Sequence, residues 1–303
     1  MAIEIHNILI FFSTILASLS YSYFISSNLP SGIYKLISLL PIFYLFTILP
    51  LLLSSAITTA ITAFFFTWIA NFKLVLFAFN RPPLHPTKSL TRFIAIASLP
   101  FKIESSNSFK SDPKRPPLNV TITIAIESFV LPLLINYVYN HRRDMNPHIL
   151  LIIYCFLIFL FVDLLVFVSS FVIFTVTGVD IEPPSDEPYL ATSLQNFWGR
   201  RWNLTVTNTL RHTVYKPVKS FFSGNEWDWV PAVITTFFVS GLMHELLLYH
   251  VTKGVSPTWE MTSFFGLHGA CVVVEVAVKR AVAGKLEFPV AVSRVLTVGF
   301  VVV

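Results

Sequence analysis

The chain has 303 residues, of which 54% are hydrophobic and 12% charged, and it carries a net charge of +5. Soluble domains contain about 25% charged residues, and a water-soluble fold could not bury this much apolar surface, so a soluble globular protein is excluded. Cys155 and Cys271 lie far apart in apolar runs, which predicts neither a disulfide framework nor a zinc site. The composition therefore predicts an integral membrane protein.

Apolar runs follow one another along the chain. A membrane span needs about 20 residues, because the bilayer core is roughly 30 Å thick. The apolar runs cover residues 7–25, 33–53, 56–79, 119–139, 149–177, 230–250, 261–278 and 289–303. The end of the third run, 71–79, suits either a span or a helix lying in the membrane surface. We predict an all-α fold, a polytopic transmembrane helical bundle of seven to nine spans, in which residues 1–303 form a single domain.

Two long polar segments separate these runs. Residues 80–118 form a basic loop with one amphipathic piece at 90–99, and residues 178–229 form a second loop. Together with 279–288 they hold fifteen lysines and arginines, whereas the shorter loops on the other side hold three. Because cytosolic loops carry the excess of these residues, we expect the long loops to face the cytosol. No aromatic-basic pattern of an RNA-recognition module occurs, so nucleic acid is not an expected partner.

The second loop contains a dense polar and aromatic run, Asn-Phe-Trp-Gly-Arg-Arg-Trp-Asn, at residues 196–203. Residues 192–195, Thr-Ser-Leu-Gln, fit a capping box with Thr192 as the cap, so a helix should start there. Trp198 and Trp202 belong to an apolar, aromatic side that suits a helix near the lipid headgroups. The alternative is an interfacial helix with no chemical role.

Three polar residues of this run suit acyl or phosphate chemistry. Arg200 and Arg201 have planar guanidinium groups that grip phosphates. Asn203 is a neutral donor suited to a developing oxyanion. We predict that Asn203 is brought together with His244, and that chemistry takes place between them.

His244 lies in the sequence Ser-Gly-Leu-Met-His-Glu at residues 240–245. At 1.5 Å per residue it lies roughly 22 Å along a helix that enters near Trp229, well inside the hydrocarbon region. A His beside Glu245 at this depth is a functional candidate. Ser240 lies on the same helix face, and Gly241 allows another backbone to approach closely. The alternative is a core histidine that only bonds a neighbouring helix.

Several other chemistries fail on spacing. His250 follows His244 at i+6, whereas a zincin helix requires i+4, so we predict no metal site. There is no Gly-x-Ser-x-Gly elbow and no P-loop. Glu275 and Lys279 are expected to pair at i,i+4. Glu127 and Asp163 are expected either to pair with polar groups on other helices or to line a cavity. His268 lies between two glycines and is expected either to contact substrate or to pack against its neighbours.

Residues 196–203, followed by His244, resemble the membrane-bound O-acyltransferase superfamily, and residues 240–245 are similar to the Ser-x-x-x-His-Glu pattern of its diacylglycerol and sterol branches. The closer resemblance is to the plant wax synthases, the long-chain-alcohol O-fatty-acyltransferases. Residues 71–74, 257–260 and 264–269 also look like that group.

The resemblance implies that His244 is the general base on a fatty alcohol and that Asn203 donates to the thioester carbonyl of acyl-CoA. Acyl-CoA is then a substrate, and no cofactor is expected. The supporting residues would be Glu245, Ser240 and Trp202, the acyl-CoA-binding residues Arg200, Arg201 and Trp198, and a candidate substrate contact His268. The resemblance also implies a multi-pass protein of the endoplasmic reticulum, and it leaves the oligomeric state open.

Three alternatives stay open. The same machinery would accept a sterol, because both acceptors are apolar with one hydroxyl. A proton-coupled transporter would use the ionisable groups as a relay, although no repeat between halves is visible. The last run stops at Val303 without a polar flank, which leaves open a missing C-terminal piece and a non-catalytic relative.

Overall fold

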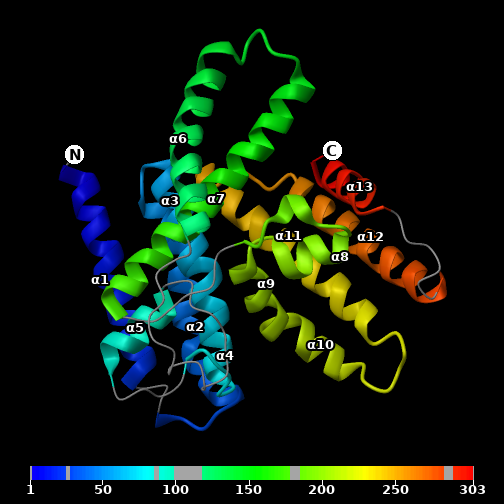
Figure 1. The fold of residues 1–303 in the computed structure, drawn as a ribbon. Helices are drawn as coiled ribbons and strands as arrows, with labels where there is room; N and C mark the ends of the chain where they lie inside the picture. Colours follow the sequence, from blue (N-terminus) through cyan, green and yellow to red (C-terminus); the bar gives the residue numbers. More distant parts are fainter. Residues whose placement is uncertain are drawn as a thin grey trace. The chain divides into compact units, whose positions relative to one another are not determined.

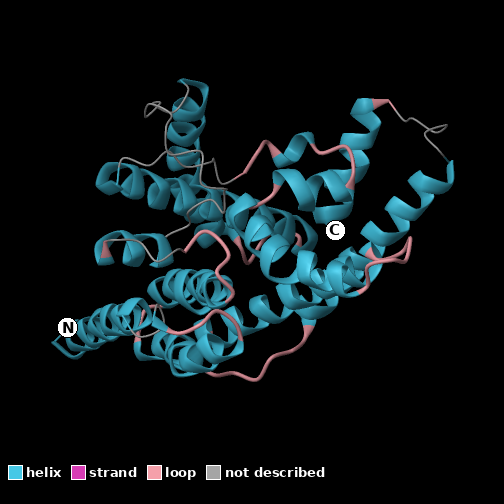
Figure 2. Ribbon diagram, turned by 90° about the horizontal axis from the view of Figure 1, so that it is seen from below, coloured by secondary structure: helices cyan, strands magenta, loops and turns pink. Residues whose placement is uncertain are grey.

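The computed structural model describes residues 2–24, 28–84, 89–98, 118–177, 185–282 and 289–302, and these residues form helices and connecting loops without strands (Figures 1 and 2). Their contacts gather in two compact units, which are described separately. The first comprises Met1–Ser106 and Thr205–Ala283, and the second comprises Asn107–Leu204 and Gly284–Val303. The prediction of a single domain stays a prediction.

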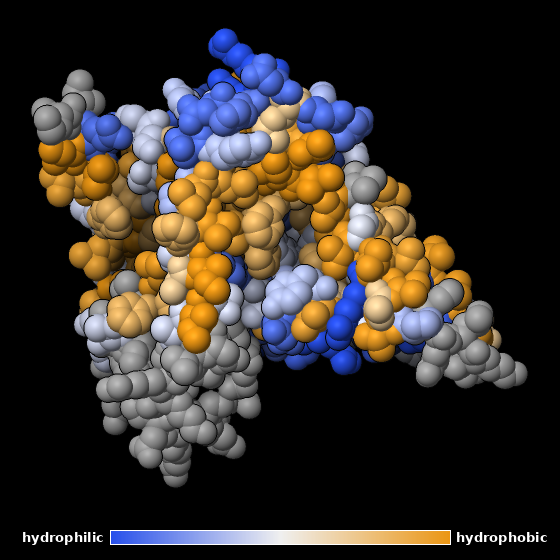
Figure 3. All heavy atoms as spheres, turned by 45° about the horizontal axis from the view of Figure 1, so that its top comes forward, coloured by the Kyte–Doolittle hydropathy of each residue, from blue (hydrophilic) through white to orange (hydrophobic). Residues whose placement is uncertain are grey.

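Seven helical segments in the described residues are long and apolar enough to cross a membrane. This confirms the predicted all-α multi-pass fold, and seven is the lower end of the predicted range of seven to nine spans. The segments are Glu4–Phe24, Ile33–Leu52, Ala56–Ala78, Thr121–His141, Pro147–Ser169, Trp229–Val251 and Glu260–Val282. The last run forms α13 (Val290–Val302), which is shorter. Large apolar side chains such as Phe129, 69% exposed, point outward, and Figure 3 shows apolar residues over much of the face it draws. Lipid is the solvent that suits this surface.

In the first unit, the third span is the most buried. It is built from α3 (Ala56–Thr62), a π-helix (Ala63–Ala70) and α4 (Asn71–Ala78), so the segment left undecided by the sequence continues the span. Lys73 has no exposed surface, and its ammonium donates to the Ile96 carbonyl at 2.7 Å. That carbonyl belongs to α5 (Leu90–Ser98), which confirms the amphipathic piece of the first basic loop.

The other helices of this unit are α1 (Ala2–Phe24), α2 (Ile33–Ile48) with the 3₁₀ turn Leu49–Leu52, α9 (Leu204–Leu210), a π-helix (Arg211–Tyr215), α10 (Lys216–Phe221), α11 (Trp229–Val251) and α12 (Glu260–Val282). Of these, α2, α11 and the π-helix Arg211–Tyr215 contact the third span directly. The C-terminal end of α11 is tied to its neighbours: His250 Nε2 lies 2.6 Å from the Thr47 carbonyl, and Lys253 donates to the Thr59 hydroxyl at 2.7 Å.

Helices α11 and α12 approach closely at two glycines. A Cβ on Gly241 would lie 2.7 Å from the Cα of Thr262, and one on Gly269 would lie 2.8 Å from the Cβ of Phe237. Both distances are shorter than van der Waals contact, so only glycine permits this spacing. The expectation for Gly241 is confirmed.

The second unit contains α6 (Leu118–His141) and α7 (Pro147–Thr177), which lie side by side in Figure 1. The Ser185 hydroxyl donates to Asp163 of α7. Glu127 of α6 is 7% exposed and lies close enough to Asp163 for the two carboxyl groups to interact. The two carboxyl groups therefore lie near each other across α6 and α7.

The segment predicted as a long loop at 178–229 is largely helical where it is described. Besides α9 and α10 it holds a 3₁₀ turn (Pro188–Leu190), α8 (Leu194–Asn196) and a π-helix (Phe197–Arg201). The predicted helix start is confirmed, but its cap is one residue later: the Ser193 hydroxyl, not that of Thr192, accepts from the Asn196 amide at 3.0 Å. The segments are three to seven residues long, too short to show a helical period in the sequence.

We predict that Gly241→Ala and Gly269→Ala lower the thermal unfolding midpoint of the detergent-solubilised protein, because overpacking costs about 1–3 kcal/mol. Gly266→Ala is the matched control on α12, since a Cβ there meets nothing within 4 Å. It should be neutral or stabilising, because alanine favours a helix by up to about 1 kcal/mol over glycine. Equal midpoints for the three variants would contradict the close approach.

Candidate functional site

The ring of His244 lies between two aromatic side chains. It stacks on Phe265 of α12, with ring centroids 4.3 Å apart and an interplanar angle of 30°. The Trp68 ring of the third span meets it edge-on, 5.0 Å away at 78°. The imidazole is partly buried, and these contacts from two other helices fix the plane in which it lies.

One nitrogen of the His244 ring forms a hydrogen bond within its own helix. His244 Nδ1 lies 2.7 Å from the backbone carbonyl oxygen of Ser240. A carbonyl only accepts, so Nδ1 carries the proton and donates it. In the neutral ring, Nε2 then keeps its lone pair, which is the form that a general base requires. Ser240 thus contributes through its backbone, from the helix face predicted for it.

Glu245 makes a contact of its own with α12. It is 4% exposed, and its Oε1 accepts from the backbone amide of Thr262 at 3.2 Å. Thr262 lies in the first turn of α12, where backbone amides lack partners within the helix. Glu245 therefore caps α12, and its expected action on His244 stays a prediction.

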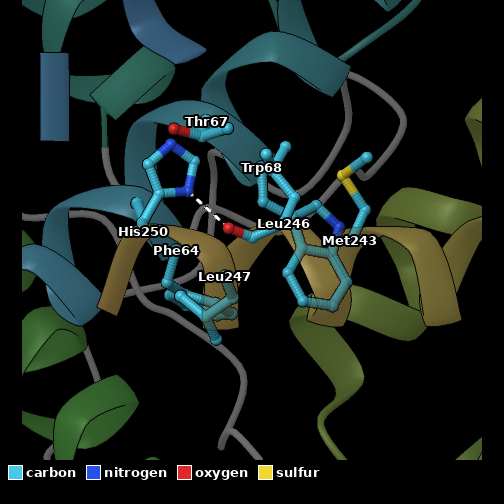
Figure 4. A pocket seen from close by; sticks show the side chains of 8 residues that line it. Phe64, Thr67, Trp68, Met243, Leu246, Leu247 and His250 are labelled. Atoms are coloured by element: carbon cyan, nitrogen blue, oxygen red, sulfur yellow. Dashed lines mark hydrogen bonds between the residues drawn. The ribbon is translucent and has the colours of Figure 1, made fainter. Parts of the chain in front are cut away.

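An apolar pocket lies along α11 beside His244. The pocket is small, and Trp68 both lines it and contacts the His244 ring. Its lining residues come from the third span and α11: Ala63, Phe64, Thr67, Trp68, Met243, Leu246, Leu247 and His250 (Figure 4). In Figure 4 the His250 ring extends toward Thr67, and its Nδ1 lies 2.6 Å from the Leu246 carbonyl.

His268 lies on α12, as expected, and is 3% exposed. Its Nδ1 is 2.9 Å from the Phe264 carbonyl, and the two rings are 4.1 Å apart. The ring is thus held within its own helix, and the predicted substrate contact stays a prediction.

In the second unit, Asn203 has a left-handed backbone, with φ of 37°. Asparagine adopts this region more readily than most residues. The residue stands between the π-helix Phe197–Arg201 and α9, at the turn from one to the other. Asn203 and His244 belong to different units, so their predicted meeting stays a prediction.

The tryptophans before Asn203 form an aromatic stack. Trp202 lies parallel to Phe197, 5.9 Å away at 12°, and against Phe159 of α7, 5.7 Å away at 30°. Trp198 meets Phe197 edge-on at 5.0 Å. The stack attaches the run to α7, and the supporting role predicted for Trp202 stays a prediction.

The two arginines of the run differ. Arg201 donates to Asn196 Oδ1 at 2.9 Å and to the Asp186 carbonyl at 2.8 Å, and it also lies 3.7 Å from the Asp186 carboxylate. Arg200 is exposed. Of the two arginines predicted to bind acyl-CoA, Arg201 is engaged in holding its own segment together, whereas Arg200 is accessible.

Sequence reasoning did not identify Trp68 and Phe265, because neither carries a motif of its own. It did anticipate the ion pair of Glu275 with Lys279, which is present and confirmed. The carboxylates of a proposed relay instead have separate local contacts: Glu127 with Asp163, Glu245 with α12, and Glu275 with Lys279. These contacts count against the transporter alternative.

Comparisons with known proteins identify the family of this chain. Residues 181–267 match the model of the membrane bound O-acyl transferase family. The probable long-chain-alcohol O-fatty-acyltransferase 1 of Arabidopsis thaliana is 45% identical, over 91% of this chain and 82% of its own length. The long-chain-alcohol O-fatty-acyltransferase of Simmondsia chinensis is 39% identical, over 95% of this chain and 84% of its own length. The acyl-CoA–sterol O-acyltransferase 1 of Arabidopsis thaliana is 38% identical, over 95% of this chain and 85% of its own length.

The identities to these relatives extend over most of the chain, and residues 181–267 include both Asn203 and His244. The seven candidate spans agree with a multi-pass membrane enzyme. The chain therefore belongs to the membrane-bound O-acyltransferase family, as a homologue of the plant long-chain-alcohol O-fatty-acyltransferases, the wax synthases.

Proposed function

We propose that this protein esterifies a long-chain fatty alcohol with the acyl group of acyl-CoA, and so makes a wax ester. The observation that carries the proposal is the His244 imidazole, whose Nδ1 donates to Ser240 and whose ring lies between Trp68 and Phe265. This geometry presents a basic nitrogen inside a membrane helix, where an apolar alcohol arrives from the bilayer.

The proposed reaction is a direct transfer. His244 Nε2 takes the proton of the alcohol, and the alcohol oxygen forms a bond to the thioester carbonyl carbon. The carbonyl oxygen becomes an oxyanion, to which the Asn203 amide donates a hydrogen bond. When the C–S bond breaks, the CoA sulfur leaves as a thiolate and the proton held by His244 neutralises it. Acyl-CoA and alcohol are consumed, and ester and free CoA are formed.

The remaining site residues support these two. Ser240 fixes the His244 tautomer, and Glu245 holds α12, which brings Phe265 onto the ring. Trp202 anchors the Asn203 turn to α7. Arg200, whose side chain is exposed, meets acyl-CoA on the cytosolic side. We also propose that the protein resides in the endoplasmic reticulum, as the wax-synthase resemblance implies.

A sterol is the second candidate acceptor, because one relative is named as an acyl-CoA–sterol O-acyltransferase. The test uses microsomes that contain this chain and labelled palmitoyl-CoA, with either a long-chain alcohol or a sterol, and separates the products by thin-layer chromatography. We expect wax ester. If only steryl ester is formed, the acceptor is a sterol and not a fatty alcohol. The absence of any ester from well-expressed protein would contradict the proposal that the protein is an acyltransferase.

We predict that His244→Ala abolishes ester formation while the protein still accumulates in membranes, because the variant lacks the group that takes the alcohol proton. His148→Ala serves as the matched control, since this histidine is exposed near the start of α7. Near-normal activity of His244→Ala would contradict the proposed mechanism.

We predict that Asn203→Ala lowers kcat by roughly 10²–10³ with little change in the KM for either substrate, as the loss of one oxyanion donor does. The left-handed backbone complicates this variant, because alanine is strained there. Asn203→Gly removes the amide and keeps the backbone relaxed. Equal losses in both variants indicate the amide, whereas an active glycine variant would assign Asn203 a conformational role only.

We predict that Arg200→Gln and Arg201→Gln have different effects. The first should raise the KM for acyl-CoA and leave stability unchanged, because the Arg200 side chain is exposed. The second should lower the thermal unfolding midpoint, because it removes the contacts to Asn196 and Asp186. Initial rates and unfolding scans on the same preparations check both, and identical behaviour would overturn the assignment.

A further inference from the structure

A cluster of positive side chains lies in the first unit, away from the His244 ring. Its centre is His212 on the π-helix Arg211–Tyr215, which contacts both α4 and α11. Lys216 Nζ lies 3.0 Å from His212 Nε2, and the positive charges of Lys216, Arg211 and Arg81 all act on the imidazole. Residues from two distant segments of the chain thus come together.

The His212 ring holds Lys216 in place. Its Nδ1 lies 2.9 Å from the Asn208 carbonyl and therefore carries the proton, so Nε2 accepts from the Lys216 ammonium. Burial of the ring, with the repulsion of the three neighbouring cations, lowers the pKa of His212 below its usual value. The imidazole is consequently neutral at neutral pH and available as this acceptor.

The position of Arg81 is also set by the fold. Arg81 follows α4 in a turn that closes on the helix, where its backbone amide donates to the Leu76 carbonyl at 2.9 Å. The side chains of Arg81, Arg211 and Lys216 are exposed. Nearby Lys219 is paired with Asp228, 3.9 Å away. Three cations gathered around a neutral ring repel one another, and a phosphate dianion among them removes that repulsion.

We propose that Arg81, Arg211 and Lys216 bind the phosphate groups of acyl-CoA, and that His212 positions the Lys216 ammonium; this inference rests on the proposed function. Arginine presents a planar fork to phosphate oxygens, and lysine a point charge. Both segments of the cluster lie in loops that the lysine and arginine distribution places in the cytosol, where acyl-CoA is dissolved. CoA carries its thioester on a long pantetheine arm, so its phosphates bind away from His244.

The test measures initial rates of ester formation against palmitoyl-CoA concentration, with the full chain in phosphatidylcholine vesicles. Arg81→Gln, Arg211→Gln and Lys216→Gln should each raise the KM for palmitoyl-CoA about tenfold, the lower end for a hydrogen bond to a charged group, with kcat unchanged. Lys219→Gln, on the same helix as Lys216 but ion-paired, is the control and should leave KM unchanged. Unchanged KM in all three cluster variants, with ester still formed, would overturn the inference and leave the proposed function intact.

Two further experiments, one with a different substrate and one with different vesicle lipids, identify the ligand. With palmitoyl-pantetheine, which lacks the nucleotide and its phosphates, the cluster variants should match the unsubstituted protein. If the cluster binds lipid headgroups instead, its substitution will reduce activity only in vesicles that also contain phosphatidylserine, and this outcome overturns the assignment to CoA.

A binding measurement separates the inference from the reaction. Free CoA should raise the thermal unfolding midpoint of the His244→Ala protein, and adding Lys216→Gln should abolish that shift, whereas adding Lys219→Gln should not. A shift that persists in the Lys216→Gln protein contradicts the site, whether or not any ester is formed. A wild-type protein that binds CoA but makes no ester contradicts the proposed function alone.

Discussion

The close packing of α11 against α12 determines the surroundings of His244. Gly241 lets the backbone of Thr262 approach, and the next turn of α11 uses that proximity. Glu245 reaches the Thr262 amide, and Phe265, one turn further along α12, stacks on His244. Without a hydrophobic driving force between helices in lipid, such contacts depend on small residues and on polar groups that find partners. A glycine, a carboxylate and a ring therefore act as one packing unit.

The same physical requirement explains how polar groups are tolerated inside the spans. The Lys73 ammonium donates to a carbonyl of α5, and His250 lies between carbonyls of α11 and α2. Asp163 accepts a hydrogen bond from the Ser185 hydroxyl. In a bilayer every buried polar group needs a partner within the protein, because water is absent. Each of these side chains thus joins two segments that are distant in the sequence.

The sequence predicted those features that follow from composition and local spacing. The spans come from apolar length, the Glu275–Lys279 pair from i,i+4 spacing, and the Gly241 contact from the absence of a side chain. It did not predict which distant residue would meet each of these elements. Trp68 lies 176 positions before His244, and nothing local marks it as a partner of that ring. The short helices of residues 178–229 were not predicted, because segments of a few residues that are stabilised by caps and aromatic stacking are too short to show a helical periodicity of apolar residues.

The π-helix at Ala63–Ala70 has a consequence for how related sequences are aligned with this one. A π-turn accommodates about one residue more than an α-helical turn, and such turns often occur at functional sites. A deletion of one residue in this segment would restore regular α-helix and leave the helix on either side in the same phase, because the wider turn absorbs the extra residue; the side chains inside the segment, Trp68 among them, would change direction. Trp68 would then no longer face the His244 ring. The length of this segment, and not only its composition, is therefore part of the information that specifies the site.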